Sequence, residues 1–295
     1  FKAQHEWGWL AVLDFFLAGS GAGLFLVGMV LGLDSVGAIG VVAAALGALT
    51  LLADLGHPER FWRAISRPGT SWISRGAILV SLFLVFGAVH AAPAVSFLSW
   101  LPWTSGSALG TVTGIIAALA AIGVMAYTGF LLADSPAVPA WQSALVPVQF
   151  VVISLLTGAG GLYLLLPFTN AAKVNLQIWE AIGLGLGVCA LLMLLAYPLI
   201  LGSSTSGARR AGHELIGGHL GLPFLGGGVL VGLVIPIAVI LYLMLAGAVL
   251  AAATAPLGLA GLFFIIGGLS FRYSLLKAGF YEPVLQASIM QGMGN

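Results

Sequence analysis

The sequence has 295 residues, of which 60% are hydrophobic and 6% charged, and its formal net charge at pH 7 is +1. A soluble domain carries about 25% charged residues because its surface must be hydrated, so this composition excludes a chain surrounded mainly by water. The near-neutral balance gives no basic face for nucleic acid. The single cysteine, Cys189, excludes a disulfide framework and an iron–sulfur cluster bound by this chain alone.

Long apolar runs recur along the whole chain, and a membrane span needs about 20 such residues. Backbone groups in lipid must be paired within their own segment, so we expect helices. The first run is too long for the core of a signal peptide, and we expect it to be a span of the mature protein. The predicted fold class is an all-α membrane protein with eight transmembrane helices. The runs lie at about 8–33, 36–55, 74–92, 107–133, 144–167, 174–201, 225–251 and 256–276.

An even number of spans puts both termini on one face, which we call side A; the opposite face is side B. Of the ten basic residues, only Lys173 falls at side B. Basic loop residues favour the cytoplasm, so side A is predicted to be cytoplasmic. The basic residues at side A are Lys2, Arg60, Arg63, Arg67, Arg75, Arg209, Arg210, Arg272 and Lys277.

Two polar residues interrupt apolar runs close to side A. Asp14 lies six residues into the first run, and Tyr127 lies six residues before the end of the fourth, so each sits roughly 9 Å deep at 1.5 Å per residue. His57 follows the second run on the same side. An acid, a phenol and an imidazole at one shallow depth suit a quinone, whose ring is apolar and whose oxygens exchange protons. The alternative is a packing polar residue, an interfacial aromatic and a loop histidine.

Other polar positions have weaker readings. The segment 58–69 alternates arginine with apolar residues and predicts an interfacial helix that binds lipid head groups, docks a partner, or both. Glu180 near side B is either the entrance of a proton path or part of a locally satisfied helix start. Arg272 near side A either takes part in proton movement or snorkels to the interface.

A haem is not expected. Haem iron is most often held by histidines on facing helices, and His5, His57, His213 and His219 fall at or outside the side-A ends of the runs. His90 alone lies at side B, so no two histidines share a depth within two spans.

Several short motifs, in order and spacing, resemble the NrfD/PsrC family of membrane subunits from polysulfide reductase-like respiratory complexes. The polar residue followed by small residues in the first run is one of them. The other similar segments are Leu55-Gly56-His57-Pro58-Glu59-Arg60-Phe61, Thr70-Ser71-Trp72-Ile73-Ser74-Arg75-Gly76, Tyr127-Thr128-Gly129 and Pro139-Ala140-Trp141-Gln142. Tyr127 matches the family's quinone-contacting tyrosine. Asp14 stands where some members have histidine, and Gln142 replaces the commoner asparagine.

The resemblance implies two four-helix bundles, placed at residues 1–140 and 141–295, with a menaquinone or ubiquinone site in the first and no haem or cluster in this chain. It also implies a ferredoxin-like iron–sulfur partner, a molybdenum or tungsten catalytic subunit beyond it, and a prokaryotic cytoplasmic (inner) membrane. Several members carry their soluble subunits outside the cytoplasm, which conflicts with the charge bias of side A. We assign Asp14, His57, Tyr127, Gly21 and Gly56 to the quinone; Asp54, Glu59, Glu180 and Arg272 to proton relay; and Arg60, Arg63 and Arg67 to partner docking.

Three functions follow from these patterns. The first is a quinone-reactive electron-transfer subunit that also couples to proton movement. The second is a secondary transporter, which would place polar residues and helix breaks near the bilayer centre. Here the breaks at Pro198 and Pro236 are few and the polar cluster is shallow. The third is a structural anchor for a soluble enzyme, which leaves Asp14 and Tyr127 unexplained.

Overall fold

The computed structural model describes residues 2–54, 65–169 and 174–281. Within these residues, eight helices are long and apolar enough to cross a membrane, which confirms the predicted number of spans. The spans are α1 (Trp9–Leu31), α2 (Asp34–Asp54), α3 (Trp72–Ala91), α4 (Ala108–Ala133), α5 (Leu145–Leu165), α6 (Leu176–Gly202), η7 with α8 (Leu222–Val234 and Ile235–Ala246) and α9 (Leu250–Lys277).

Shorter elements join the spans. The 3-10 turns η2 (Ala92–Ala94) and η3 (Ser96–Leu98) follow α3, η4 (Pro139–Gln142) precedes α5, and η5 (Leu166–Phe168) ends it. The connection before the seventh span, for which the sequence predicted no helix, contains the amphipathic helix α7 (Ser206–Ile216), whose buried face includes Ala208, Ala211 and Leu215.

Local sequence explains where several helices begin. Among the described helices, α3, α4, α6 and α7 start after Ser71, Ser107, Asn175 and Thr205, whose side chains each accept a hydrogen bond from a backbone N–H three residues on. The seventh span begins as the π-helix η7 and continues as α8. Pro198 does not interrupt α6, which runs on to Gly202.

Both ends of the described chain meet at side A. Strand β1 (Lys2–Ala3) pairs antiparallel with β2 (Phe280–Tyr281), which follows the last span. The buried Gln4 side chain strengthens this closure by donating a 2.9 Å hydrogen bond to the carbonyl oxygen of Leu276. The pairing of β1 with β2 therefore places both ends of the described chain on the same side, as an even number of spans requires.

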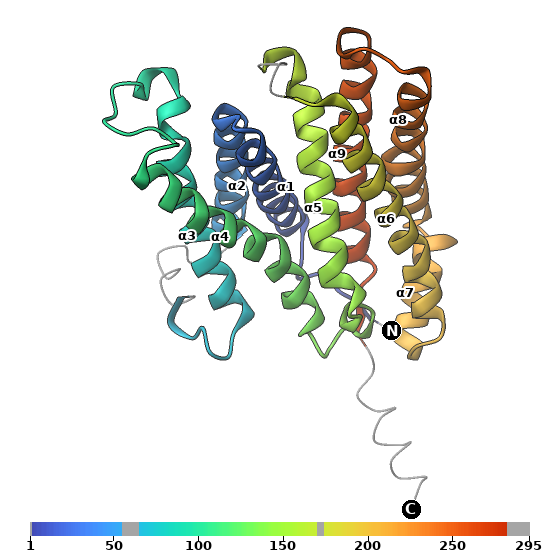
Figure 1. Ribbon diagram of the computed structural model, residues 1–295. Coiled ribbons are helices and arrows are strands. Elements are labelled where there is room, and N and C mark those ends of the chain that lie inside the picture. Colours follow the sequence, from blue (N-terminus) through green and yellow to red (C-terminus); the bar gives the residue numbers. More distant parts are fainter. Residues whose placement is uncertain (1, 55–64, 170–173, 282–295) are drawn as a thin grey trace, which may run out of the picture.

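Helices α1 and α5 lie between the remaining spans (Figure 1), with α2–α4 on one side and α6–α9 on the other. The two central helices cross where Gly158 meets the backbone of Gly23, an approach that a side chain at Gly158 would prevent. Because α1 packs against α2, α4, α5 and α9, the division into bundles at residues 1–140 and 141–295 stays a prediction.

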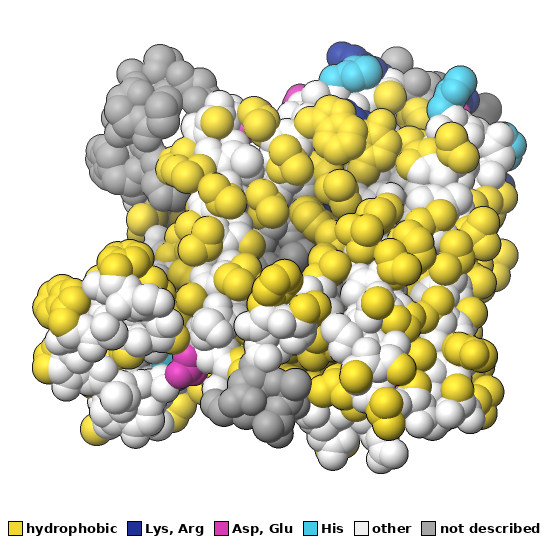
Figure 2. Space-filling view, turned by 90° about the horizontal axis from the view of Figure 1, so that it is seen from above, with side chains coloured by type: hydrophobic (Ala, Val, Ile, Leu, Met, Phe, Trp, Pro, Cys, Tyr) yellow, Lys and Arg dark blue, Asp and Glu magenta, His cyan; other side chains and the backbone are white. Residues whose placement is uncertain are grey.

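The molecular surface suits a lipid environment. Figure 2 shows hydrophobic side chains over most of the face in view, with Lys, Arg and His gathered mainly along one edge. Large apolar side chains such as Leu119 and Leu192 are more than 60% exposed in mid-span, which water would penalise and lipid does not. The chain is a multi-pass membrane protein.

Candidate functional site

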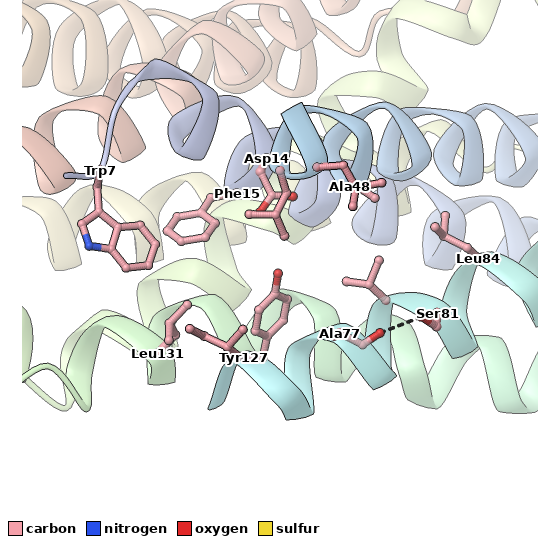
Figure 3. A pocket seen from close by; sticks show the side chains of 13 residues that line it. Trp7, Asp14, Phe15, Ala48, Ala77, Ser81, Leu84, Tyr127 and Leu131 are labelled. Atoms are coloured by element: carbon pink, nitrogen blue, oxygen red, sulfur yellow. Dashed lines mark hydrogen bonds between the residues drawn. The ribbon is translucent and has the colours of Figure 1, made fainter. Parts of the chain in front are cut away.

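A cavity of about 340 Å³ lies among α1, α2, α3 and α4. Its volume falls within the usual range for small-molecule pockets. The walls are almost entirely apolar, and Figure 3 shows Asp14 and Tyr127 approaching each other across the space. The lining residues are Trp7, Asp14, Phe15, Ala48, Leu51, Leu52, Ile73, Ala77, Val80, Ser81, Leu84, Tyr127 and Leu131.

Asp14 is held in this wall by the second turn of α1 and is 1% exposed. Its Oδ2 atom has no hydrogen-bond partner among the described residues. A buried carboxylate without a partner is costly in apolar surroundings. The aromatic rings of Trp7 and Phe15, whose centres lie 5.5 Å apart, form one wall of the cavity next to Asp14. The site therefore favours a ligand that supplies a hydrogen-bond donor to Asp14.

Tyr127 comes from the last third of α4 and is 5% exposed. Its ring lies against Gly76 of α3, and its hydroxyl is directed towards Asp14 (Figure 3). No described residue hydrogen-bonds to this hydroxyl, whereas the buried phenols of Tyr163 and Tyr197 donate to the carbonyl oxygens of Trp179 and Ala140. Buried phenols usually find a partner, so Tyr127 also has capacity for a ligand.

The rest of the cavity offers little polarity. The Ser81 hydroxyl is engaged on its own helix, where it donates a 2.8 Å hydrogen bond to the Ala77 carbonyl oxygen. Ser81 is exposed and Ile73 is 53% exposed on the outer face of α3. The cavity thus reaches the lipid-facing surface of α3, and a lipid-soluble molecule could enter without crossing water.

The structure brings together only part of the predicted quinone set. Gly21 is not among the residues that line the cavity; a side chain there would meet the Ala44 backbone nitrogen of α2 at 2.7 Å. Asp54, the last residue of α2, is exposed and lies two residues beyond the cavity-lining Leu52. His57, Gly56, Glu59, Arg60 and Arg63 lie outside the described residues.

The segment 58–69, predicted as an interfacial helix, is described only from Ile65 onward. That part forms a short helical turn followed by a turn at 68–70, with Arg67 exposed. The Arg75 guanidinium donates to the carbonyl oxygens of Pro68 and Gly69, at 2.9 Å each. The turn before α3 is therefore fixed to that helix.

Glu180 lies near side B, in the first turns of α6 and away from the cavity. The helix start is capped by Asn175, but Glu180 itself is 3% exposed and its Oε1 atom lacks a hydrogen-bond partner among the described residues. The helix start is therefore satisfied locally by Asn175, but within the described part of the chain Oε1 of Glu180 does not share in that satisfaction. Its role in a proton path stays a prediction.

Arg272 is fully buried in α9, which is at odds with the prediction that it snorkels to the interface. Its Nη2 donates to the Ser154 hydroxyl at 2.7 Å and its Nη1 to the Gly268 carbonyl at 3.1 Å. The guanidinium also lies 5.8 Å from the centre of the Phe16 ring and 5.4 Å from that of Phe150. Arginine is held there because α1, α5 and α9 supply acceptors and aromatic faces deep inside the bundle.

Most of the residues that line the cavity were not predicted, among them Trp7 and Ser81, and neither was the contact of Gly76 with the Tyr127 ring. Gly76 ends a segment singled out for its resemblance to a family motif, which was the available signal. Trp7 precedes the first span, and Ser81 sits in an otherwise apolar run. Among the described residues, no group of three or more His, Cys, Asp or Glu side chains could hold a metal ion.

Comparison with known proteins adds to this geometry. A family model described as "Polysulphide reductase, NrfD" matches residues 2–283. The C subunit of selenate reductase from Mesobacillus selenatarsenatis is 25% identical over 329 aligned positions, covering 95% of this chain and 75% of that protein. The C subunit of sulfite dehydrogenase from Allochromatium vinosum is 27% identical over 171 positions, covering 48% of this chain and 50% of that protein.

Proposed function

Because the chain belongs to the NrfD polysulphide reductase family, we propose that it is the quinone-reactive membrane subunit of a respiratory oxidoreductase complex and is not active alone. It exchanges electrons between membrane menaquinone or ubiquinone and an iron–sulfur partner. The observation that carries this proposal is the apolar, lipid-reaching cavity whose polar end holds Asp14 and Tyr127, neither of which hydrogen-bonds to a residue that the structure describes.

The chemistry of the cavity suits both halves of a quinone. The apolar walls accommodate the ring, while the Tyr127 hydroxyl can donate a hydrogen bond to one ring oxygen. Oxidation of a quinol releases two electrons and two protons, and the Asp14 carboxylate can accept the two protons one after the other, passing on the first before it takes the second. The electrons leave through the partner. Because every step is reversible, the same groups serve quinone reduction.

Protons must also leave the cavity. Asp54 stands at the side-A end of α2, two residues beyond the cavity-lining Leu52, and it is exposed. We propose that Asp54 passes protons between the cavity and side A, together with His57 and Glu59 of the following segment. This places proton exchange on the face that carries the termini, which the charge bias assigns to the cytoplasm.

The partner is proposed to dock at side A. The two relatives are subunits of enzymes named for selenate and sulfite, which are both small oxyanions. By analogy, this chain would serve a ferredoxin-like iron–sulfur subunit with a molybdenum or tungsten catalytic subunit beyond it. Arg67 and Arg209 are exposed at side A and, with Arg60 and Arg63, would face an acidic partner surface.

Two substitutions test the site in the assembled complex. Tyr127→Phe removes one hydrogen bond and is expected to lower quinol-linked turnover about tenfold; Asp14→Asn removes the proton acceptor and is expected to lower it about 10²-fold. Turnover is measured with a short-chain quinol, and assembly by co-purification of the iron–sulfur subunit. Tyr163→Phe is the matched control, because it removes a buried phenol hydroxyl that donates to the Trp179 carbonyl oxygen outside the cavity. Full turnover in both variants would refute the site.

A further inference from the structure

The ring of Tyr127 rests directly on the backbone of α3 at Gly76. A Cβ atom at Gly76 would lie 3.0 Å from Cζ of the ring and closer still to Cδ2 and Cε2. Real side chains do not approach so closely, so the ring or the helix would have to move. Gly76 is buried between α3 and α4, and its missing side chain is what leaves room for the phenol.

The helix has little freedom to yield. One turn earlier, Trp72 of α3 stacks on Phe130 of α4, with ring centres 4.8 Å apart and planes 9° apart. The Arg75 guanidinium lies 4.5 Å from the centre of the Trp72 ring and also holds the preceding turn. These contacts fix the register between α3 and α4. An added methyl at Gly76 would therefore displace the Tyr127 ring rather than the helix.

A second glycine in the same interface behaves differently. Gly123 lies one turn before Tyr127 on α4, and a Cβ there would meet the Leu79 side chain, with Cδ2 at 2.6 Å. The end of a leucine can rotate away at small cost, whereas an aromatic ring pressed on backbone cannot. The two positions thus form a matched pair, in which only Gly76 controls the phenol.

We infer that Gly76 is a positioning residue that sets the direction of the Tyr127 hydroxyl into the cavity, and so the geometry with which a quinone oxygen is bound. This inference rests on the proposed function. It assigns to α3 a role beyond lining the cavity, because α3 supplies the surface against which the reactive phenol of α4 is aimed at the space opposite Asp14 (Figure 3).

A double-mutant cycle in the purified complex tests this inference. Gly76→Ala is expected to lower quinol turnover by about 10²-fold at most, the scale of an ångström of misplacement, and by no less than Tyr127→Phe does. In the Tyr127→Phe background, which has no hydroxyl left to misplace, Gly76→Ala should add less than about a twofold loss. Gly123→Ala, the control, should keep turnover in both backgrounds.

The outcomes separate this inference from the proposed function. Full turnover of Tyr127→Phe would refute the role of the phenol itself. Two results would overturn only the positioning role, provided that Tyr127→Phe lowers quinol turnover. In the first, Gly76→Ala leaves turnover unchanged. In the second, Gly76→Ala lowers turnover by the same factor in the wild-type and Tyr127→Phe backgrounds. If Gly76→Ala prevents assembly, the assembly yield of the double variant Gly76→Ala/Tyr127→Ala is measured instead. Because the double variant lacks the Tyr127 ring, its yield should equal that of Tyr127→Ala alone. A double variant that still fails to assemble contradicts the inference.

Discussion

Two buried polar clusters of this protein differ in how their groups are satisfied. Asp14 and Tyr127 face a cavity of about 340 Å³ and make no hydrogen bond with the described residues. Arg272 lies in packed surroundings, where Ser154 and the Gly268 carbonyl accept hydrogen bonds from its two Nη atoms, and only its Nε has no partner among the described residues. A void of about 10 Å³ is bounded by Gly268 and Ile153, but Arg272 does not line it.

The difference shows which buried polar group has room for a ligand. A polar side chain within a membrane span is a functional candidate by default, and both Asp14 and Arg272 meet that criterion in the sequence. Packing separates them, because unsatisfied groups beside empty space can gain from a bound molecule, whereas enclosed groups hold helices together. Arg272 bridges α5 and α9, and the Thr157–Ser20 hydrogen bond of 2.9 Å links α5 to α1 beside it.

The largest expected effect is on stability, from Arg272→Ala. The change leaves a cavity at a fully buried position and removes the hydrogen bond to the Ser154 hydroxyl. Together these losses should lower the free energy of unfolding by about 3 kcal/mol. The thermal midpoint of the purified complex should fall clearly, while turnover per assembled complex stays close to that of the wild type. An unchanged thermal midpoint with lost turnover would contradict the structural role of Arg272 and would support its assignment to the proton relay.

A smaller effect is expected from filling the cavity with Ala77→Leu. The added atoms would enter space that a ring otherwise occupies, so KM for a short-chain quinol should rise about tenfold, equivalent to about 1.4 kcal/mol. The thermal midpoint should change little, because the new side chain meets empty volume rather than packed neighbours. A lowered midpoint with unchanged KM would mean that quinol does not use this cavity.

The sequence predicted the membrane spans well, because runs of about 20 apolar residues have few alternatives in lipid. The sequence-based predictions were less accurate for the ends of the spans and for the helix between two of them. The eighth span was expected from about residue 256 but begins at Leu250, since Pro256 is accommodated within α9. Helix α7 was missed because its polar face hides the 3.6-residue repeat of Ala208, Ala211 and Leu215.

The two ionisable groups of the cavity could be predicted from sequence, whereas most of its apolar lining could not. Asp14 and Tyr127 stand out as polar residues in apolar runs, and their shared side follows from counting spans. Gly76 could not be assigned a role, because the contact of its backbone with Tyr127 depends on the register of α3 against α4. Of the two alternatives for Arg272, snorkelling could be excluded only from the packing of α1, α5 and α9, which encloses the side chain.

Photoaffinity labelling of the intact complex with an azido-substituted quinone tests the central claim most directly. The account predicts adducts on the cavity-lining parts of α1, α3 and α4, around Asp14, Ala77 and Tyr127, and their loss when excess unlabelled quinol is present. Competable adducts confined to other segments, such as the start of α6 around Glu180, would contradict the assignment of this cavity as the quinone site.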